Sequence, residues 1–195
     1  MQAARGASLT DSDKARRRRL RILLFGCAGL VYVLDVVTKH LAVTRLDPGD
    51  PVQVVGDVLR LTLVRNPGAA FSAGTSFTLV LSLVAVVAVV VVLVLARRVG
   101  SPGWAVALGL LLGGVAGNLT DRLLRSPGVL RGHVVDFLQL PNWPVFNVAD
   151  ISINCAAALI VILSLRGRAL DGHRVDSSDD TAVDPGRPRD EEDVR

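Results

Sequence analysis

The fold is decided by a charge-free stretch from Phe77 to Ala96, which reads FTLVLSLVAVVAVVVVLVLA. As an α-helix, such a stretch is long enough to cross the ~30 Å hydrocarbon core of a bilayer. Three further apolar blocks occupy Leu20–Val43, Trp104–Leu119 and Phe146–Leu165. A chain of 195 residues could not bury four such blocks in a soluble core. The sequence therefore predicts an all-α membrane protein with four transmembrane helices, at about 20–43, 77–96, 104–122 and 146–165.

The two ends of the chain lack the apolar residues that a packed core requires. Residues 1–15 are mostly small or polar, and residues 167–195 are rich in Asp, Glu, Arg, Pro and Gly. Such segments bury too little surface to offset the entropy lost on ordering. We expect a disordered N-terminal extension over 1–15, a four-helix membrane domain over 16–166 and a disordered acidic tail over 167–195.

The formal charge of +4 does not indicate a nucleic-acid partner, because the basic residues cluster at the ends of the apolar blocks. Basic residues that flank transmembrane helices collect on the cytoplasmic side of the membrane. There are three such clusters: Lys14 with Arg16–Arg19, Arg97 with Arg98, and Arg166 with Arg168. All three would lie on the same side of the membrane if both termini were cytoplasmic. The sequence thus predicts a multi-pass protein with both termini in the cytoplasm.

The long loop between the first two blocks has strand character. Val52–Val55 and Val58–Val64 are rich in β-branched residues, and Gly56-Asp57 between them forms a turn signal. We expect a small β-hairpin on the outer membrane surface.

The third block carries glycines at positions 109, 113 and 117. This spacing places them on one helix face, where the backbone of a neighbouring helix can approach closely. The pattern predicts helix packing and not chemistry.

Two aspartates stand where the apolar blocks meet water. Asp136 lies in His133-Val-Val-Asp-Phe137, and Asp150 ends Phe146-Asn-Val-Ala-Asp150 at the start of the fourth block. A carboxylate at this depth is costly to desolvate and usually has a function. Two such groups at one membrane face can share a proton, as acid–base catalysts do.

Further polar residues are expected at the same depth. Asn147, Asp150 and Asn154 share one helix face by their spacing, Asn118 and Arg122 share another, and Asp35 and Lys39 a third. Asp35 and Lys39 can equally be read as a simple i,i+4 ion pair. Asp121 beside Arg122 is more simply explained as a local charge pair than as a catalyst.

Other catalytic schemes fit the sequence poorly. There is no His-Glu-x-x-His motif for zinc and no Gly-x-Ser-x-Gly, and three scattered histidines make a weak set of metal ligands. We therefore expect carboxylate chemistry without a metal or cofactor.

Five motifs, taken together and in order, resemble the bacterial lipoprotein signal peptidase family, also called type II signal peptidase. The resemblance covers about Val31 to Leu165. The five motifs are Asp35-Val-Val-Thr-Lys39, Asn66-Pro-Gly-Ala-Ala-Phe71, Gly113-Gly-Val-Ala-Gly-Asn-Leu-Thr-Asp-Arg122, Val134-Val-Asp-Phe137 and Phe146-Asn-Val-Ala-Asp150.

The resemblance implies an intramembrane aspartic endopeptidase of the bacterial inner membrane. Such an enzyme removes the signal peptide from diacylglyceryl-modified prolipoproteins on the N-terminal side of the lipidated cysteine. Carried over by motif, the catalytic residues are Asp136 and Asp150. The residues that bind substrate or support this pair are Asn66, Gly68, Asn118, Arg122 and Asn147, with Asp35 and Lys39 as a further pair.

The same resemblance implies an active site at the extracytoplasmic face. The partners would be a lipid-modified prolipoprotein and membrane lipid, with no nucleic acid, and the protein would be a monomer.

Two other functions are compatible with parts of the sequence. A small proton-coupled transporter would use intramembrane carboxylates, but it would place polar groups near the bilayer centre. A non-catalytic scaffold would explain the glycine spacing and the tail, but not the paired aspartates.

Overall fold

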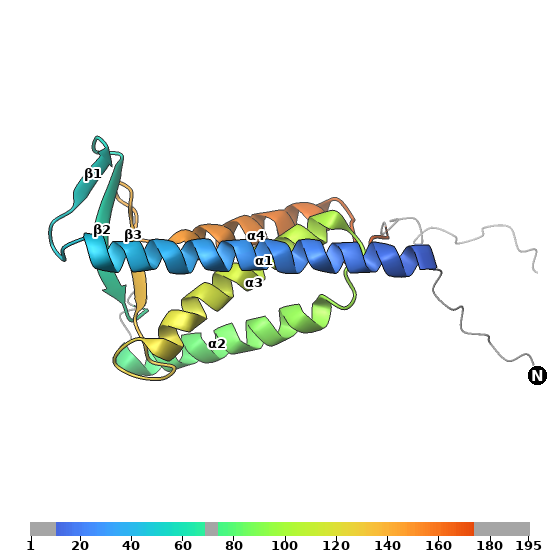
Figure 1. The fold of residues 1–195 in the computed structure, drawn as a ribbon, viewed down its shortest axis with the longest axis horizontal. Helices are drawn as coiled ribbons and strands as arrows, with labels where there is room; N and C mark the ends of the chain where they lie inside the picture. Colours follow the sequence, from blue (N-terminus) through green and yellow to red (C-terminus); the bar gives the residue numbers. More distant parts are fainter. Residues whose placement is uncertain (1–10, 69–73, 174–195) are drawn as a thin grey trace, which may run out of the picture.

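The computed structural model describes residues 11–68 and 74–173. It contains the helices α1 (Asp11–Arg45), α2 (Gly74–Leu95), α3 (Pro102–Leu124) and α4 (Val148–Leu165). Within these ranges, four helices are long and apolar enough to cross a membrane, which confirms the predicted fold class. They lie along a common direction, with a small sheet at one end, and the first and last described residues, 11 and 173, lie at the other (Figure 1). We call these the sheet end and the terminal end.

The helix boundaries differ from the predicted ones mainly in α1, which begins at Asp11 and not at Leu20. Its 35 residues span about 52 Å at 1.5 Å per residue, more than a ~30 Å hydrocarbon core needs. The basic stretch Arg16–Arg19 thus continues the helix beyond the apolar region.

The beginning of the expected disordered tail is packed against the terminal end of the bundle. The Trp104 indole nitrogen donates to the Arg168 carbonyl at 2.9 Å, and the Gly100 amide donates to the Leu170 carbonyl at 2.9 Å. The expected disorder therefore does not apply to residues 167–173. The rest of that segment, residues 174–195, and residues 1–10 of the N-terminal extension lie outside the described residues.

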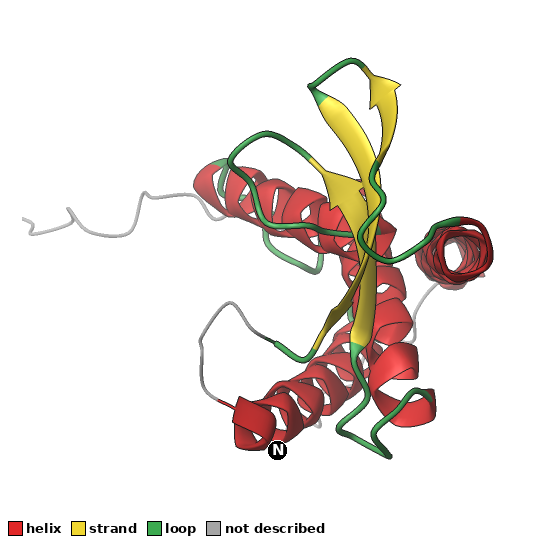
Figure 2. Ribbon diagram, turned by 90° about the vertical axis from the view of Figure 1, so that its left-hand side faces the viewer, coloured by secondary structure: helices red, strands yellow, loops and turns green. Residues whose placement is uncertain are grey.

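The sheet has three antiparallel strands in the order β1-β2-β3 and lies across the ends of the helices (Figure 2). The predicted hairpin is confirmed as β1 (Val52–Val55) and β2 (Leu59–Asn66). The third strand, β3 (Val134–Gln139), was not predicted, because Asp136 was expected in a loop. In β3, Asp136 pairs with Val64 of β2, so the strand fixes the aspartate against the hairpin.

The glycine face of α3 packs on α1. A Cβ at Gly109 would lie 2.7 Å from the Leu24 carbonyl oxygen, and one at Gly113 would lie 2.6 Å from the Ala28 carbonyl oxygen. Both distances are too short for any other residue, so the two backbones meet only because these positions are glycine. Gly117, at the sheet end of the same face, lies against the Asp35 carboxylate.

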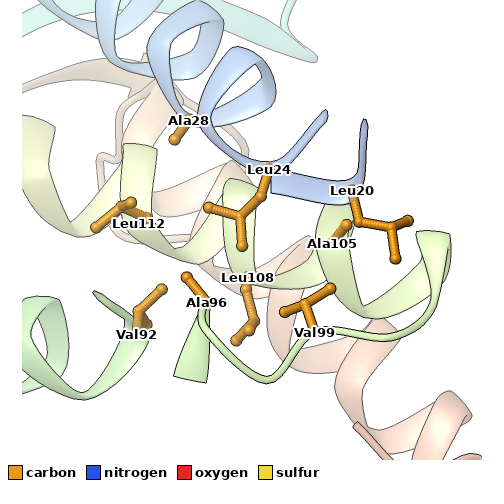
Figure 3. Packing of buried hydrophobic residues seen from close by; sticks show 9 residues of the cluster. All are labelled: Leu20, Leu24, Ala28, Val92, Ala96, Val99, Ala105, Leu108 and Leu112. Atoms are coloured by element: carbon orange, nitrogen blue, oxygen red, sulfur yellow. The ribbon is translucent and has the colours of Figure 1, made fainter. Parts of the chain in front are cut away.

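The terminal end is held by an apolar cluster shared by α1, α2 and α3 (Figure 3). Leu24 of α1 is fully buried between the two other helices, and Leu108 of α3 is 2% exposed. The buried members of the cluster are Leu20, Leu24, Ala28, Val92, Ala96, Val99, Ala105, Leu108 and Leu112. At this end the described part of the bundle is thus held together by side-chain packing.

Candidate active site

Asp136 lies on β3 and is buried, with 2% of its surface exposed. Its two carboxylate oxygens each accept a hydrogen bond from an asparagine. Asn66 Nδ2 donates to Oδ2 at 2.8 Å, and Asn147 Nδ2 donates to Oδ1 at 2.7 Å. Two neutral amides thus hold the carboxylate in one orientation without adding charge.

Asp150 is the third residue of α4 and takes part in a capping box with Asn147. The Asp150 amide donates to Asn147 Oδ1 at 2.9 Å, and the Asn147 amide donates to Asp150 Oδ2 at 3.2 Å. This exchange satisfies backbone groups that a helix N-terminus leaves unpaired. The local sequence Asn-x-x-Asp therefore both starts the helix and fixes the Asp150 side chain.

Asn147 brings the two aspartates together. It is fully buried, its side chain donates to Asp136, and its backbone amide donates to Asp150. Asn118 of α3 supports Asp150 from the other side, since its Nδ2 donates to Asp150 Oδ1 at 2.9 Å. The structure therefore joins both predicted catalytic residues and the predicted supporting residues Asn66, Asn118 and Asn147 in one hydrogen-bonded group.

Gly68 has a defined part in this arrangement. Its amide donates to Asn66 Oδ1 at 2.8 Å, and this bond orients the Asn66 side chain so that the NH₂ group faces Asp136. Gly68 has a φ of 102°, a region that glycine adopts readily and other residues rarely do. Residues 69–71 of the same motif lie outside the described residues.

Asp35 and Lys39 form the expected i,i+4 ion pair, with 2.7 Å between Lys39 Nζ and Asp35 Oδ2. The pair is nevertheless not a simple interfacial one, because both side chains are almost completely buried. Lys39 Nζ also donates to Asn118 Oδ1 at 2.8 Å, and Asp35 Oδ1 accepts from the Ala149 amide at 2.9 Å. Asp35 and Lys39 therefore form an ion pair that is connected to Asp150 and α4 through Asn118 and the Ala149 amide.

Asp121 is more important to this cluster than the sequence suggested. It pairs with Arg125 and not with the adjacent Arg122, and its Oδ2 lies 3.1 Å from Lys39 Nζ. The same oxygen accepts from the Val135 amide at 3.1 Å, next to Asp136 in the chain. Asp121 thus fixes β3 to α3. The i,i+4 spacing to Arg125 is a sequence signal that could have identified this partner.

Arg122 is half-buried beside the aspartates, and the carboxylates of Asp136, Asp150 and Asp121 all act electrostatically on it. Its buried Nη1 has no hydrogen-bond partner within residues 11–68 and 74–173.

Asn154, which the helical spacing grouped with Asp150, is exposed, and its side chain donates only to the Asp150 backbone carbonyl. Asn154 therefore lies one turn from Asp150 but makes no hydrogen bond to either carboxylate.

The surroundings favour a proton on Asp136. The pKa of this carboxyl is raised to about 6, chiefly by burial and in addition by the charge of the nearby Asp150. The hydrogen bonds from Asn66 and Asn147 and the charge of Lys39 act in the opposite direction. A carboxyl with such a pKa can both hold and release a proton near neutral pH.

The described residues contain no group of three or more His, Cys, Asp or Glu side chains suited to a metal ion.

Known proteins similar to this chain have one function in common. The lipoprotein signal peptidase of Rhodococcus jostii is 54% identical over 154 residues, which cover 79% of this chain and 78% of the relative. That of Mycobacterium tuberculosis (strain ATCC 25618 / H37Rv) is 55% identical over 166 residues, covering 85% and 82% respectively.

The fold has solved counterparts as well. A structure described as a bacterial membrane enzyme, solved by the in meso method at 1.9 Å resolution, is similar with a TM-score of 0.66 and 28% sequence identity. The match covers 73% of this chain and 92% of that one. The family model described as signal peptidase (SPase) II matches residues 27–166, which include part of α1, all of α2, α3 and α4, and both aspartates. The chain therefore belongs to the signal peptidase II family.

Proposed function

We propose that this protein is an aspartic endopeptidase that removes the signal peptide from diacylglyceryl-modified prolipoproteins, on the N-terminal side of the lipidated cysteine. The observation that carries the proposal is the position of Asn147, which donates hydrogen bonds to both Asp136 and Asp150 at the sheet end of the bundle. Two carboxylates held this closely do not both ionise easily, and a pair with one proton can act as acid and base together.

In this mechanism Asp150 is the ionised base and Asp136 the protonated acid. A water molecule between them gives a proton to Asp150 while its oxygen attacks the carbonyl carbon of the scissile peptide bond. Asp136 donates its proton to the carbonyl oxygen, which yields a neutral tetrahedral diol. Asp150 then protonates the leaving nitrogen, and Asp136 recovers a proton from the diol as the C–N bond breaks. The carboxyl pair regains its single proton, and no covalent intermediate forms.

The remaining residues have roles in orientation and substrate binding. Asn66 and Asn147 keep the Asp136 carboxyl facing the water molecule, and Gly68 fixes Asn66. Arg122 is suited to donate to a carbonyl group of the substrate through Nη1, whose hydrogen-bonding capacity is unused within the described residues. This proposed substrate contact involves the peptide and not its acyl chains.

The membrane position of the site suits a lipid-anchored substrate. Asp150 lies in the first turn of α4 and Asp136 lies on β3. The sheet that contains β3 lies at one end of the helices (Figure 1). A signal peptide that forms a short apolar helix would bring its cleavage point to this depth, while the diacylglyceryl chains remain in the lipid. The arginines at the terminal end favour an orientation with both termini in the cytoplasm and the site at the extracytoplasmic face.

The site is built from one chain. The aspartates and the asparagines that hold them come from β2, α3, β3, α4 and the residue that precedes α4. This supports a monomer as the functional unit, since no second copy is needed to complete the hydrogen bonds described above.

The proposal can be tested by replacing each aspartate with its isosteric amide. Asp136→Asn and Asp150→Asn should each lower cleavage of a diacylglyceryl-modified prolipoprotein by about 10⁴-fold or more, because neither half of the acid–base pair can replace the other. The control is Asp57→Asn on the exposed hairpin turn, which should cleave normally. Gel mobility of the substrate reports cleavage. Normal processing by either site variant, in protein that is inserted and folded, would exclude the aspartic mechanism.

A further inference from the structure

Charged side chains of opposite sign meet around the proposed catalytic pair and come from four elements. The carboxylates are Asp35, Asp121, Asp136 and Asp150, and the cations are Lys39, Arg122 and Arg125. The ion pairs that join them run from α1 to α3, and the hydrogen bonds through Asn118 and Asn147 extend them to α4 and β3. We call this set the charge cluster.

The charge cluster has one more carboxylate than it has cations. With every group ionised it would carry one uncompensated negative charge, and a single added proton would make it neutral. Most of it is buried, since Asp35, Lys39, Asp121 and Asp136 are each less than 5% exposed. An uncompensated charge in such surroundings is costly, so the neutral state with one proton is favoured.

We propose that the buried Asp35–Lys39 pair, together with Asp121, sets the number of protons on the catalytic pair to one. In this view Asp35 and Lys39 are positioning residues that act through their charges and through Asn118, and they do not contact the reacting atoms. This inference rests on the proposed function of Asp136 and Asp150. It assigns a role to Lys39, which is buried and takes no part in the hydrolytic steps.

The contacts provide a direct path for this influence. Lys39 donates to Asn118 Oδ1, and the Nδ2 of the same amide donates to Asp150, so Asn118 links the lysine to the catalytic pair. Lys39 also acts electrostatically on Asp136, where burial and Asp150 raise the pKa to about 6. In this proposal Asp136 is the member of the pair that holds the proton.

The other elements around the pair contribute no further buried charge within the described residues. The strand β2 presents the neutral Asn66, and its neighbour Arg65 is exposed. The helix α2 contains no charged residue. His133, before β3, is half-buried, and no hydrogen bond or ion pair links its side chain to the described members of the charge cluster.

The test is the pH dependence of cleavage of a diacylglyceryl-modified prolipoprotein. For the wild type, kcat/KM should fall as the pH rises above about 6, because Asp136 then loses its proton. Asp35→Asn removes one negative charge, so the charge cluster is neutral without the extra proton. The fall in kcat/KM should then begin at least about one pH unit lower. The double variant Asp35→Asn/Lys39→Met removes one charge of each sign and should restore the wild-type pH dependence.

A second measurement does not depend on activity. Infrared absorption of protonated carboxyl groups, titrated in the purified full-length protein, counts the protons that the charge cluster holds. Lys39→Met should hold one more proton than the wild type at the same pH, and Asp35→Asn should hold one fewer. Asp11→Asn and Lys14→Met, which remove the same charges from an exposed pair on α1, should change neither measurement.

The outcomes separate this inference from the proposed function. If the wild type cleaves and Asp136→Asn does not, but Asp35→Asn leaves both the pH dependence and the proton count unchanged, the inference is wrong and the proposed function stands. If Asp136→Asn cleaves normally, the proposed function fails first. Should Asp35→Asn not fold, Asp121→Asn makes the same change of charge, and an unchanged proton count in that variant would equally overturn the inference.

Discussion

The two ends of the helical bundle differ in the contacts that α1 makes with its neighbouring helices. At the terminal end, α1 meets α2 and α3 through apolar side chains such as Leu24 and Leu108 (Figure 3). At the sheet end, α1 meets α3 and α4 through Lys39, Asn118 and Asp35, which form ion pairs and hydrogen bonds. The helix α1 changes from one kind of contact to the other along a single face.

This difference shows which part of the molecule serves folding and which serves chemistry. At the terminal end, the buried contacts between α1, α2 and α3 are apolar. Buried charges are costly in lipid and are retained where they have a function. The change from leucine at position 24 to aspartate at position 35 therefore marks the boundary between scaffold and site, and variants at the two ends should have separable effects.

Outside the proposed catalytic pair, the largest effect is expected from Asn147→Ala at the sheet end. This change removes the hydrogen bond to Asp136 and one half of the capping box with Asp150. Losing such a donor should lower kcat/KM for prolipoprotein cleavage by about 10²–10³-fold, while the lost cap costs about 1 kcal/mol of stability. Initial rates together with unfolding curves in detergent would measure both.

Asn154→Ala is the matched control for that variant, because Asn154 is exposed and lies two turns further along α4. Its rate should stay close to that of the wild type. Equal rate losses in the two variants would mean that position 147 acts through the helix and not through the carboxylates.

A smaller effect of a different kind is expected from Leu24→Ala at the terminal end. Leu24 is fully buried in the apolar cluster, so the change leaves a cavity. The free energy of unfolding should fall by about 2 kcal/mol. This is at the low end for leucine-to-alanine changes in a core, because lipid and not water surrounds the separated helices. Thermal unfolding in detergent would measure it.

Leu30→Ala on the same helix is the control, since Leu30 is 62% exposed and should tolerate the change. The activity of each folded Leu24→Ala molecule should match that of the wild type. A specific loss of activity without a loss of stability would contradict the separation of the two ends.

The features that the sequence predicted well are those with a local signal. The four membrane helices follow from the lengths of the apolar blocks, and the hairpin follows from Val52–Val55, Gly56-Asp57 and Val58–Val64. The glycines at 109 and 113 do approach the backbone of α1, as their spacing indicated. Each of these patterns lies within one stretch of chain, so its physical consequence can be read without knowing the rest of the fold.

The features that were missed depend on contacts between distant segments. The strand β3 exists because residues 134–139 pair with β2, about seventy residues earlier in the chain, as in the pair Val64 and Asp136. Asp121 owes its position to Lys39 and to the Val135 amide, which helical spacing cannot reveal. Asn154 shares a helix face with Asp150, but the buried part of that face ends within one turn. Spacing alone therefore grouped an exposed residue with the buried ones.

The smallest effect is expected from Trp104→Phe at the terminal end. The indole nitrogen donates to the Arg168 carbonyl, and phenylalanine keeps most of the ring but not this donor. The loss of one hydrogen bond should cost about 1 kcal/mol of stability, with no change in kcat/KM. Trp143→Phe is the control, because Trp143 is 65% exposed and its indole makes no hydrogen bond within the described residues. If Trp104→Phe slowed cleavage, the terminal end would influence the site across the whole length of α3, and the two ends would not be independent.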